Sequence, residues 1–187
     1  GFVLGMMLLI LSPAAVYFGG WLIDYLQKRG HADAPFRVSI GAALAIIEER
    51  MSVQSSAFEQ PHAVKDYLRL HLAGLDRECF GVMFFDARQR LIAFEVLFEG
   101  TLTHTAVHPR EVARRALQLN SAALILAHNH PSGVAEPSRS DELLTVALRQ
   151  ALGLLDVRVL DHVIVGGKFA VSFAERGTYL VICNVRP

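Results

Sequence analysis

The chain is poor in cysteine and carries no net charge, and each shortage argues against a class of function. Its 187 residues include two cysteines, Cys79 and Cys183, and neither belongs to a Cys-x-x-Cys pair. The two thiols could still pair with each other. However, no thiolate zinc site or disulfide framework is indicated, which fits a reducing cytoplasm. Eighteen basic residues balance eighteen acidic ones, so no overall electrostatic field favours nucleic acid or a membrane surface.

Several catalytic motifs are absent as well. The sequence has no His-Glu-x-x-His segment of zinc proteases and no Gly-x-Ser-x-Gly segment of serine hydrolases. A zinc deaminase needs His-x-Glu followed by Pro-Cys-x-x-Cys. Here His130 stands in place of that Glu, and no such cysteine pair follows. The sequence therefore argues against all three classes.

Charged side chains are also missing from residues 1–23, which makes this segment a candidate transmembrane helix. Lys28 and Arg29 follow it, and the bias of positive charge toward cytoplasmic loops would leave the rest of the chain in the cytoplasm. No basic residues precede the segment, so a standard signal peptide is disfavoured. A fragment, a misassigned start or an accessory helix would explain the same residues. A membrane partner is therefore expected only if the segment is genuine.

The stretch from His128 to Asp141 carries the densest chemistry. It follows an apolar run, residues 122–127, which predicts a buried strand, and it precedes residues 142–148, which predict a helix. Side chains two apart in an extended strand point to the same side, so His128 and His130 face a point to which Asp141 can return. Two imidazoles and a carboxylate suit Zn²⁺ with its fourth position open to water.

The same residues also have a simpler interpretation. Ser138 and Asp141 have the spacing of a capping box at the start of a helix, with Asp in place of the usual Glu. A His-x-His pair is common by chance. From spacing alone, a metal site and a plain helix cap are therefore about equally supported.

The complete spacing resembles a known motif. His130 is followed by seven residues, then Ser138, two more residues and Asp141, which resembles the JAMM motif of JAB/MPN-type zinc metallopeptidases. Asn129 between the histidines and the Pro-Ser-Gly that follows are similar to the RadC-like bacterial branch. In this setting Asn129 is expected to orient the loop or the substrate.

The resemblance continues beyond the motif, over about residues 58–181, and includes three further segments, 98–101, 107–112 and 161–166. No helix-hairpin-helix segment of the longer RadC-like proteins is visible upstream, so the chain resembles a short form. Two other functions stay open. One is a role associated with DNA repair or nucleic acid, which the balanced charge does not favour. The other is a non-catalytic interaction module.

The resemblance implies a zinc-dependent peptidase acting on a peptide or isopeptide bond of an unknown protein or peptide substrate. One Zn²⁺ per chain would be held by His128, His130 and Asp141. Glu78, at the head of the first expected strand, matches the family's catalytic base. Ser138 matches the serine that donates a hydrogen bond to the oxyanion of the tetrahedral intermediate.

Other residues compete for these roles when the resemblance is set aside. Glu78 alone would be a solvated acid at the end of a strand, and Glu95, Glu99 and Glu111 are further candidates for the base. The resemblance also points to Asp161 as the group that fixes the outer nitrogen of a metal-bound histidine.

Strands and helices alternate along the chain, which predicts an α/β sandwich with a mixed central sheet flanked by helices. The resemblance implies the JAB/MPN fold, which is similar to the cytidine-deaminase sandwich. Expected helices lie at 42–51 (capped by Ser39), 62–72, 109–119 and 142–148, and expected strands at 78–86, 91–98, 122–127, 157–165 and 169–171. The expected organisation is an apolar segment and linker (1–35), an accessory helix and loop (36–57) and a catalytic domain (58–187).

Overall fold

The computed structural model describes residues 17–53, 61–100 and 106–177. The chain divides into two compact units, residues 1–46 and residues 47–187. Among the described residues, no helix combines the length and apolarity needed to cross a bilayer. The predicted membrane segment, residues 1–23, lies mostly outside the described residues.

The helix α2 (Ala34–Val53) begins earlier than the sequence predicts. The expected linker ended at residue 35, and Ser39 was expected to cap the following helix. Instead, Ser39 lies inside α2, where its hydroxyl donates to the carbonyl of Pro35 at 2.8 Å. Proline is tolerated in the first turn of a helix because the N–H it lacks has no intrahelical partner there. The cap prediction is therefore wrong, and the linker prediction fails from Ala34 onward.

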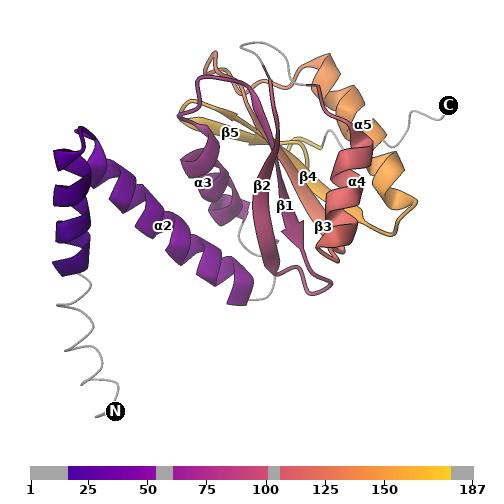
Figure 1. Ribbon diagram of the computed structural model, residues 1–187. Coiled ribbons are helices and arrows are strands. Elements are labelled where there is room, and N and C mark those ends of the chain that lie inside the picture. The colour runs from indigo at the N-terminus through magenta and orange to yellow at the C-terminus, as the bar shows by residue number, and fades with distance from the viewer. Residues whose placement is uncertain (1–16, 54–60, 101–105, 178–187) are drawn as a thin grey trace. The chain divides into compact units, whose positions relative to one another are not determined.

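The second unit is built on a five-stranded sheet in the order β2-β1-β3-β4-β5 (Figure 1). Its strands are β1 (Cys79–Phe85), β2 (Leu91–Glu99), β3 (Ala123–Asn129), β4 (Arg158–Gly166) and β5 (Phe169–Ser172). The β3–β4 pair is parallel, and the other three neighbouring pairs are antiparallel. The sheet is therefore mixed, as the alternation of elements predicts.

Helices cover both faces of this sheet. The helix α3 (Pro61–Leu72) lies on one side, and α4 (Pro109–Gln118) and α5 (Arg139–Gly153) lie on the other (Figure 1). Every residue of β1 and β3 is buried, because both of their faces are covered. This arrangement confirms the expected α/β sandwich, and it places the carboxyl end of β3 deep in the sheet beside the start of β1.

The helix α3 packs through the apolar face that its periodicity predicts. Val64, Tyr67, Leu68 and Leu72 are each no more than 5% exposed. The opposite core, under α4 and α5, joins alternate residues of β1 and β3 to both helices; its members include Phe80, Val82, Leu126, Val112 and Leu148. The loop between β3 and α5 is therefore supported by packed elements on both sides.

Candidate metal centre

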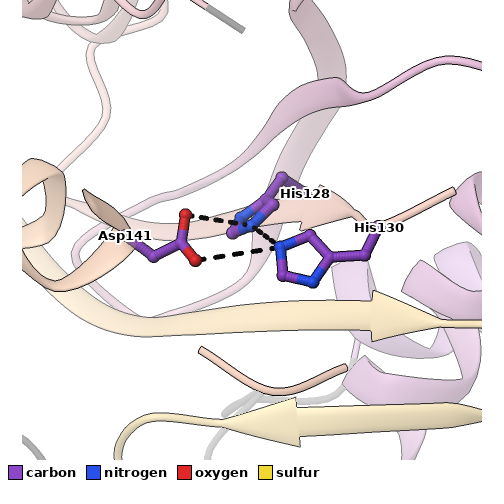
Figure 2. A group of neighbouring side chains, drawn as sticks. All are labelled: His128, His130 and Asp141. Carbon is purple, nitrogen blue, oxygen red and sulfur yellow. Dashed lines mark hydrogen bonds and ion pairs between the residues drawn. The ribbon is translucent and has the colours of Figure 1, made fainter. Parts of the chain in front are cut away.

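Two elements bring three potential metal ligands together. His128 lies near the carboxyl end of β3, His130 directly follows the strand, and Asp141 lies in the first turn of α5. Figure 2 shows the carboxylate facing both imidazole rings. His128 Nε2 lies 3.3 Å from Asp141 Oδ1, and His130 Nε2 lies 3.7 Å from Asp141 Oδ2. One ligand atom from each residue lies within 4.8 Å of the others, so the predicted set converges on one point.

The loop between the strand and the helix fixes the tautomer of His130. Its Nδ1 lies 2.7 Å from the backbone carbonyl of Val134. A carbonyl only accepts hydrogen bonds, so Nδ1 must carry the proton that is donated. In the neutral ring, the lone pair of Nε2 then points toward His128 and Asp141. Gly133, at φ +81°, lets the loop turn back far enough to place that carbonyl.

The capping box that the simpler interpretation predicts is also present. Ser138 precedes α5, its hydroxyl oxygen accepts from the Asp141 backbone N–H at 3.2 Å, and its own N–H donates to Asp141 Oδ2 at 2.8 Å. The Ser138 hydroxyl donates to the same Oδ2 at 2.6 Å. Cap and cluster therefore coexist, because the cap holds the carboxylate that faces the two histidines.

The electrostatics of the cluster fit a cation. Burial alone would raise the pKa of the Asp141 carboxyl, but hydrogen bonding and charge from His128, together with hydrogen bonds from Ser138, lower it well below its usual value. The Nε2 atoms of His128 and His130 lie 2.9 Å apart beside this carboxylate. Two ring nitrogens at that distance need a shared proton or a cation between them. Imidazole nitrogen and carboxylate oxygen are also donors that zinc accepts, so the residues fit the expected ion.

Glu78 lies at the same site. It lines a pocket of about 280 Å³ whose other walls include Phe80, Val107, His128, Ser140 and Asp141. Two of the competing glutamates are engaged elsewhere. Glu95 forms an ion pair with Arg115, and Glu111 pairs with Arg110 and Arg114. Glu78 is therefore the candidate base that the described pocket places beside the ligands.

Asn129 fastens the segment that carries Glu78, the candidate base. It is the last residue of β3, lies between the two histidines in sequence, and is 3% exposed. Its Oδ1 accepts from the Cys79 N–H at 2.8 Å, and its Nδ2 donates to the carbonyls of Arg77 at 2.9 Å and Leu75 at 3.3 Å. These bonds fasten the backbone on both sides of Glu78. The amide that separates the metal ligands in sequence thus positions the segment carrying the candidate base.

The predicted role of Asp161 is wrong. Its carboxylate accepts from the His162 N–H at 2.7 Å, the Ser172 hydroxyl at 2.5 Å and the Ala174 N–H at 3.0 Å, so it joins β4 to the turn after β5. The neighbouring His162 instead lies against the outer nitrogen of His128, with Nε2 2.9 Å from Nδ1. The pair Asp161-His162 was singled out from the sequence, but adjacent strand residues face opposite sides, and the histidine is the one facing the site.

Comparisons with known proteins agree with this architecture. The sequence model of the RadC-like JAB domain matches residues 58–178. A UPF0758 protein of Leptothrix cholodnii is 67% identical over 124 residues, which are 66% of this chain and 56% of that protein. The UPF0758 protein YkfG of Escherichia coli K12 is 52% identical over 138 residues, 74% of this chain and 87% of that protein. A UPF0758 protein of Janthinobacterium is 50% identical over 163 residues, 86% of this chain and 72% of that protein. The chain thus spans little more than half the length of the Leptothrix relative.

Proposed function

The chain belongs to the RadC-like JAB domain family, and we propose that it is a zinc-dependent hydrolase that cleaves a peptide or isopeptide bond. The observation that carries the proposal is the convergence of His128, His130 and Asp141, with Glu78 in the same pocket. Three protein ligands leave one position of a tetrahedral ion open, which is the arrangement of a catalytic rather than a structural zinc site.

The proposed chemistry divides between the ion and the protein. A bound zinc would supply a Lewis acid that lowers the pKa of a coordinated water and polarises a carbonyl group. His128, His130 and Asp141 would hold the ion. Glu78 would accept the proton of the attacking water and deliver it to the leaving amine, so that one carboxyl group acts first as base and then as acid. The pocket walls formed by Phe80 and Val107 would limit access of bulk water to this proton transfer.

The oxyanion role of Ser138 stays a prediction. Its hydroxyl proton is directed to Asp141 Oδ2 at 2.6 Å. One proton cannot serve two acceptors, so Ser138 would have to release Asp141 before it could donate to a substrate oxyanion. The backbone N–H of Ser138 would still hold Asp141 during that exchange, because it donates to the same oxygen at 2.8 Å.

The first test is the metal content of the full chain purified without added zinc. We expect about one zinc per chain in the wild type and a clear loss in His128→Ala, because removing one of three ligands weakens the site strongly. His62→Ala removes an exposed imidazole from the first turn of α3 and is the matched control, expected to keep its zinc. Wild-type protein that binds no zinc, even when zinc is offered, would refute the metal site.

The second test is catalysis, using a panel of peptides and isopeptide-linked conjugates. Glu78→Gln should keep its zinc and lose cleavage, because glutamine cannot accept the proton. Zinc binding without cleavage of any substrate would favour an interaction module. A nucleic-acid role has less support, because the arginine stripe of α4 is paired with carboxylates; its members are Arg110, Arg114 and Arg115. Salt-sensitive DNA binding that survives His128→Ala would revive that role.

A further inference from the structure

A series of buried polar groups links His128 to the backbone of Asp141. His162 Nε2 lies 2.9 Å from His128 Nδ1, and His162 Nδ1 lies 2.6 Å from the Thr145 hydroxyl oxygen. That hydroxyl in turn lies 2.6 Å from the backbone carbonyl of Asp141. His162 and Thr145 are fully buried. The series therefore connects two proposed ligands, His128 and Asp141, through groups that water does not reach.

The proton on each group can be assigned from the one member that only accepts. The Asp141 carbonyl has no proton, so the Thr145 hydroxyl donates to it. The Thr145 oxygen must then accept from His162, which places the His162 proton on Nδ1. His162 is completely buried, and burial disfavours a charged imidazole, so the ring is assigned as neutral. Its Nε2 is therefore an acceptor, and His128 must donate to it from Nδ1.

This assignment decides which nitrogen of His128 is free to bind a metal. With the proton on Nδ1, the Nε2 lone pair points to the ligand cluster. The opposite tautomer would place a proton on Nε2, where His130 Nε2 at 2.9 Å or Asp141 Oδ1 at 3.3 Å would accept it and the metal position would be blocked. Because the carboxylate favours that competing tautomer, the Nδ1–H tautomer needs a hydrogen-bond acceptor at Nδ1 to stabilise it.

We propose that Thr145 and His162 form a buried relay that keeps His128 in the Nδ1–H tautomer and so raises the metal affinity of the site. The relay deepens the proposed function and rests on its metal site. Two aromatic rings pack against His162, whose ring centroid lies 5.8 Å from that of Phe80 and 4.9 Å from that of Phe173. Groups that orient a ligating histidine in this way typically change metal affinity by about 10- to 100-fold when they are removed.

The test compares four full-length proteins: the wild type, Thr145→Val, Thr145→Ser and Ser121→Ala. Valine has nearly the shape of threonine but no hydroxyl, so His162 loses the acceptor for its Nδ1 proton. Serine restores the hydroxyl. Ser121 carries a buried hydroxyl just before β3 that can donate to the carbonyl of either Phe85 or Ala123, so Ser121→Ala controls for the general cost of a lost buried hydrogen bond. Zinc affinity is measured by competition with a chelating dye, and the His128 tautomer is read from the ring ¹⁵N shifts of the metal-free protein.

We expect Thr145→Val to bind zinc about tenfold or more weakly and to move the His128 proton toward Nε2. Thr145→Ser should recover most of the affinity, and Ser121→Ala should match the wild type in zinc affinity even if it unfolds more easily. An unchanged tautomer and affinity in Thr145→Val would overturn the relay. The ring spectra need no metal. A wild-type protein that binds no zinc would therefore refute the metal site, and the tautomer alone would then decide whether the relay exists.

Discussion

Asn129 offers a sharp test of how the site is assembled, because a single amide fastens a segment about fifty residues away in sequence. Asn129→Ala would leave the buried Cys79 N–H without its partner, at a cost of about 1–3 kcal/mol, and would remove bonds to two partly buried carbonyls, each worth about 0.5–1.5 kcal/mol. Losses within one network do not add fully, so we expect the free energy of unfolding to fall by about 2–4 kcal/mol.

Asn129→Asp tests the two halves of the amide separately, because it keeps an accepting oxygen and removes the donating NH₂ group. Aspartate keeps an oxygen for the Cys79 N–H, but its second oxygen would face the carbonyl of Arg77 at the 2.9 Å that the amide nitrogen now occupies. We therefore expect this variant to be at least as destabilised as Asn129→Ala at pH 7. Repulsion raises the folded-state pKa of the new carboxyl above its unfolded value of about 3.9, so the folded state binds more protons. Stability relative to Asn129→Ala should then rise as the pH falls through that folded-state pKa.

The assay is urea unfolding at pH 7 and pH 4, with metal content measured alongside. Gln150→Ala removes an exposed amide from α5 and should change stability by less than about 0.5 kcal/mol. Zinc content should stay near that of the wild type in both Asn129 variants, because the two imidazoles leave the opposite face of β3. The described role of the amide is wrong if Asn129→Ala has the same free energy of unfolding as Gln150→Ala. It is also wrong if Asn129→Asp is as stable as the wild type at pH 7.

Three further predictions concern the supports of the site. In Gly166→Ala the new methyl group would lie 2.7 Å from the backbone carbon of Val134, whose carbonyl holds the His130 ring. Zinc affinity should therefore fall, while Gly153→Ala, with open space around it, should keep its affinity in the same dye competition. Ser138→Ala should lose about 1 kcal/mol of unfolding free energy with the cap yet keep its zinc, since the backbone N–H still holds the carboxylate; loss of zinc would mean that the hydroxyl itself orients the ligand. Burial raises the pKa of Asp161, so the folded state binds this proton more tightly than the unfolded state does. The contribution of Asp161 to the free energy of unfolding therefore falls as the pH rises through the folded-state pKa. In urea unfolding, the free energy of unfolding of Asp161→Asn should therefore increase relative to that of the wild type between pH 4 and pH 7. A difference that does not depend on pH would contradict this.

Local periodicity predicted much of the fold. The alternation of apolar strands with amphipathic helices identified all five strands of the sheet, with bounds close to those observed for β1, β2 and β4. The expected start of α2 was wrong because Pro35 was assigned to the linker, whereas a proline in the first turn costs a helix no hydrogen bond. The expected domain boundaries at residues 35 and 57 stay a prediction beside the division of the chain at residue 46.

Motif spacing predicted the convergence of His128, His130 and Asp141 for a local reason. His128 lies near the end of β3, His130 follows it by two residues, and Asp141 lies in the first turn of the next helix, so a short stretch of chain brings all three together. Glu78 was a harder choice among several glutamates. Only the described pocket and the ion pairs of Glu95 and Glu111 distinguished it.

The sequence by itself determined which side chains can act as ligands, because strand and helix periodicities operate over a few residues. Tertiary structure alone decided what surrounds those ligands. The antiparallel pairing of β1 with β3 sets Phe80 opposite His128 and brings the backbone on either side of Glu78 within reach of the Asn129 amide. The parallel pairing of β4 with β3 places His162 against the outer nitrogen of His128. Strand register between distant segments is fixed by the packing of the whole core, and no local pattern specifies it.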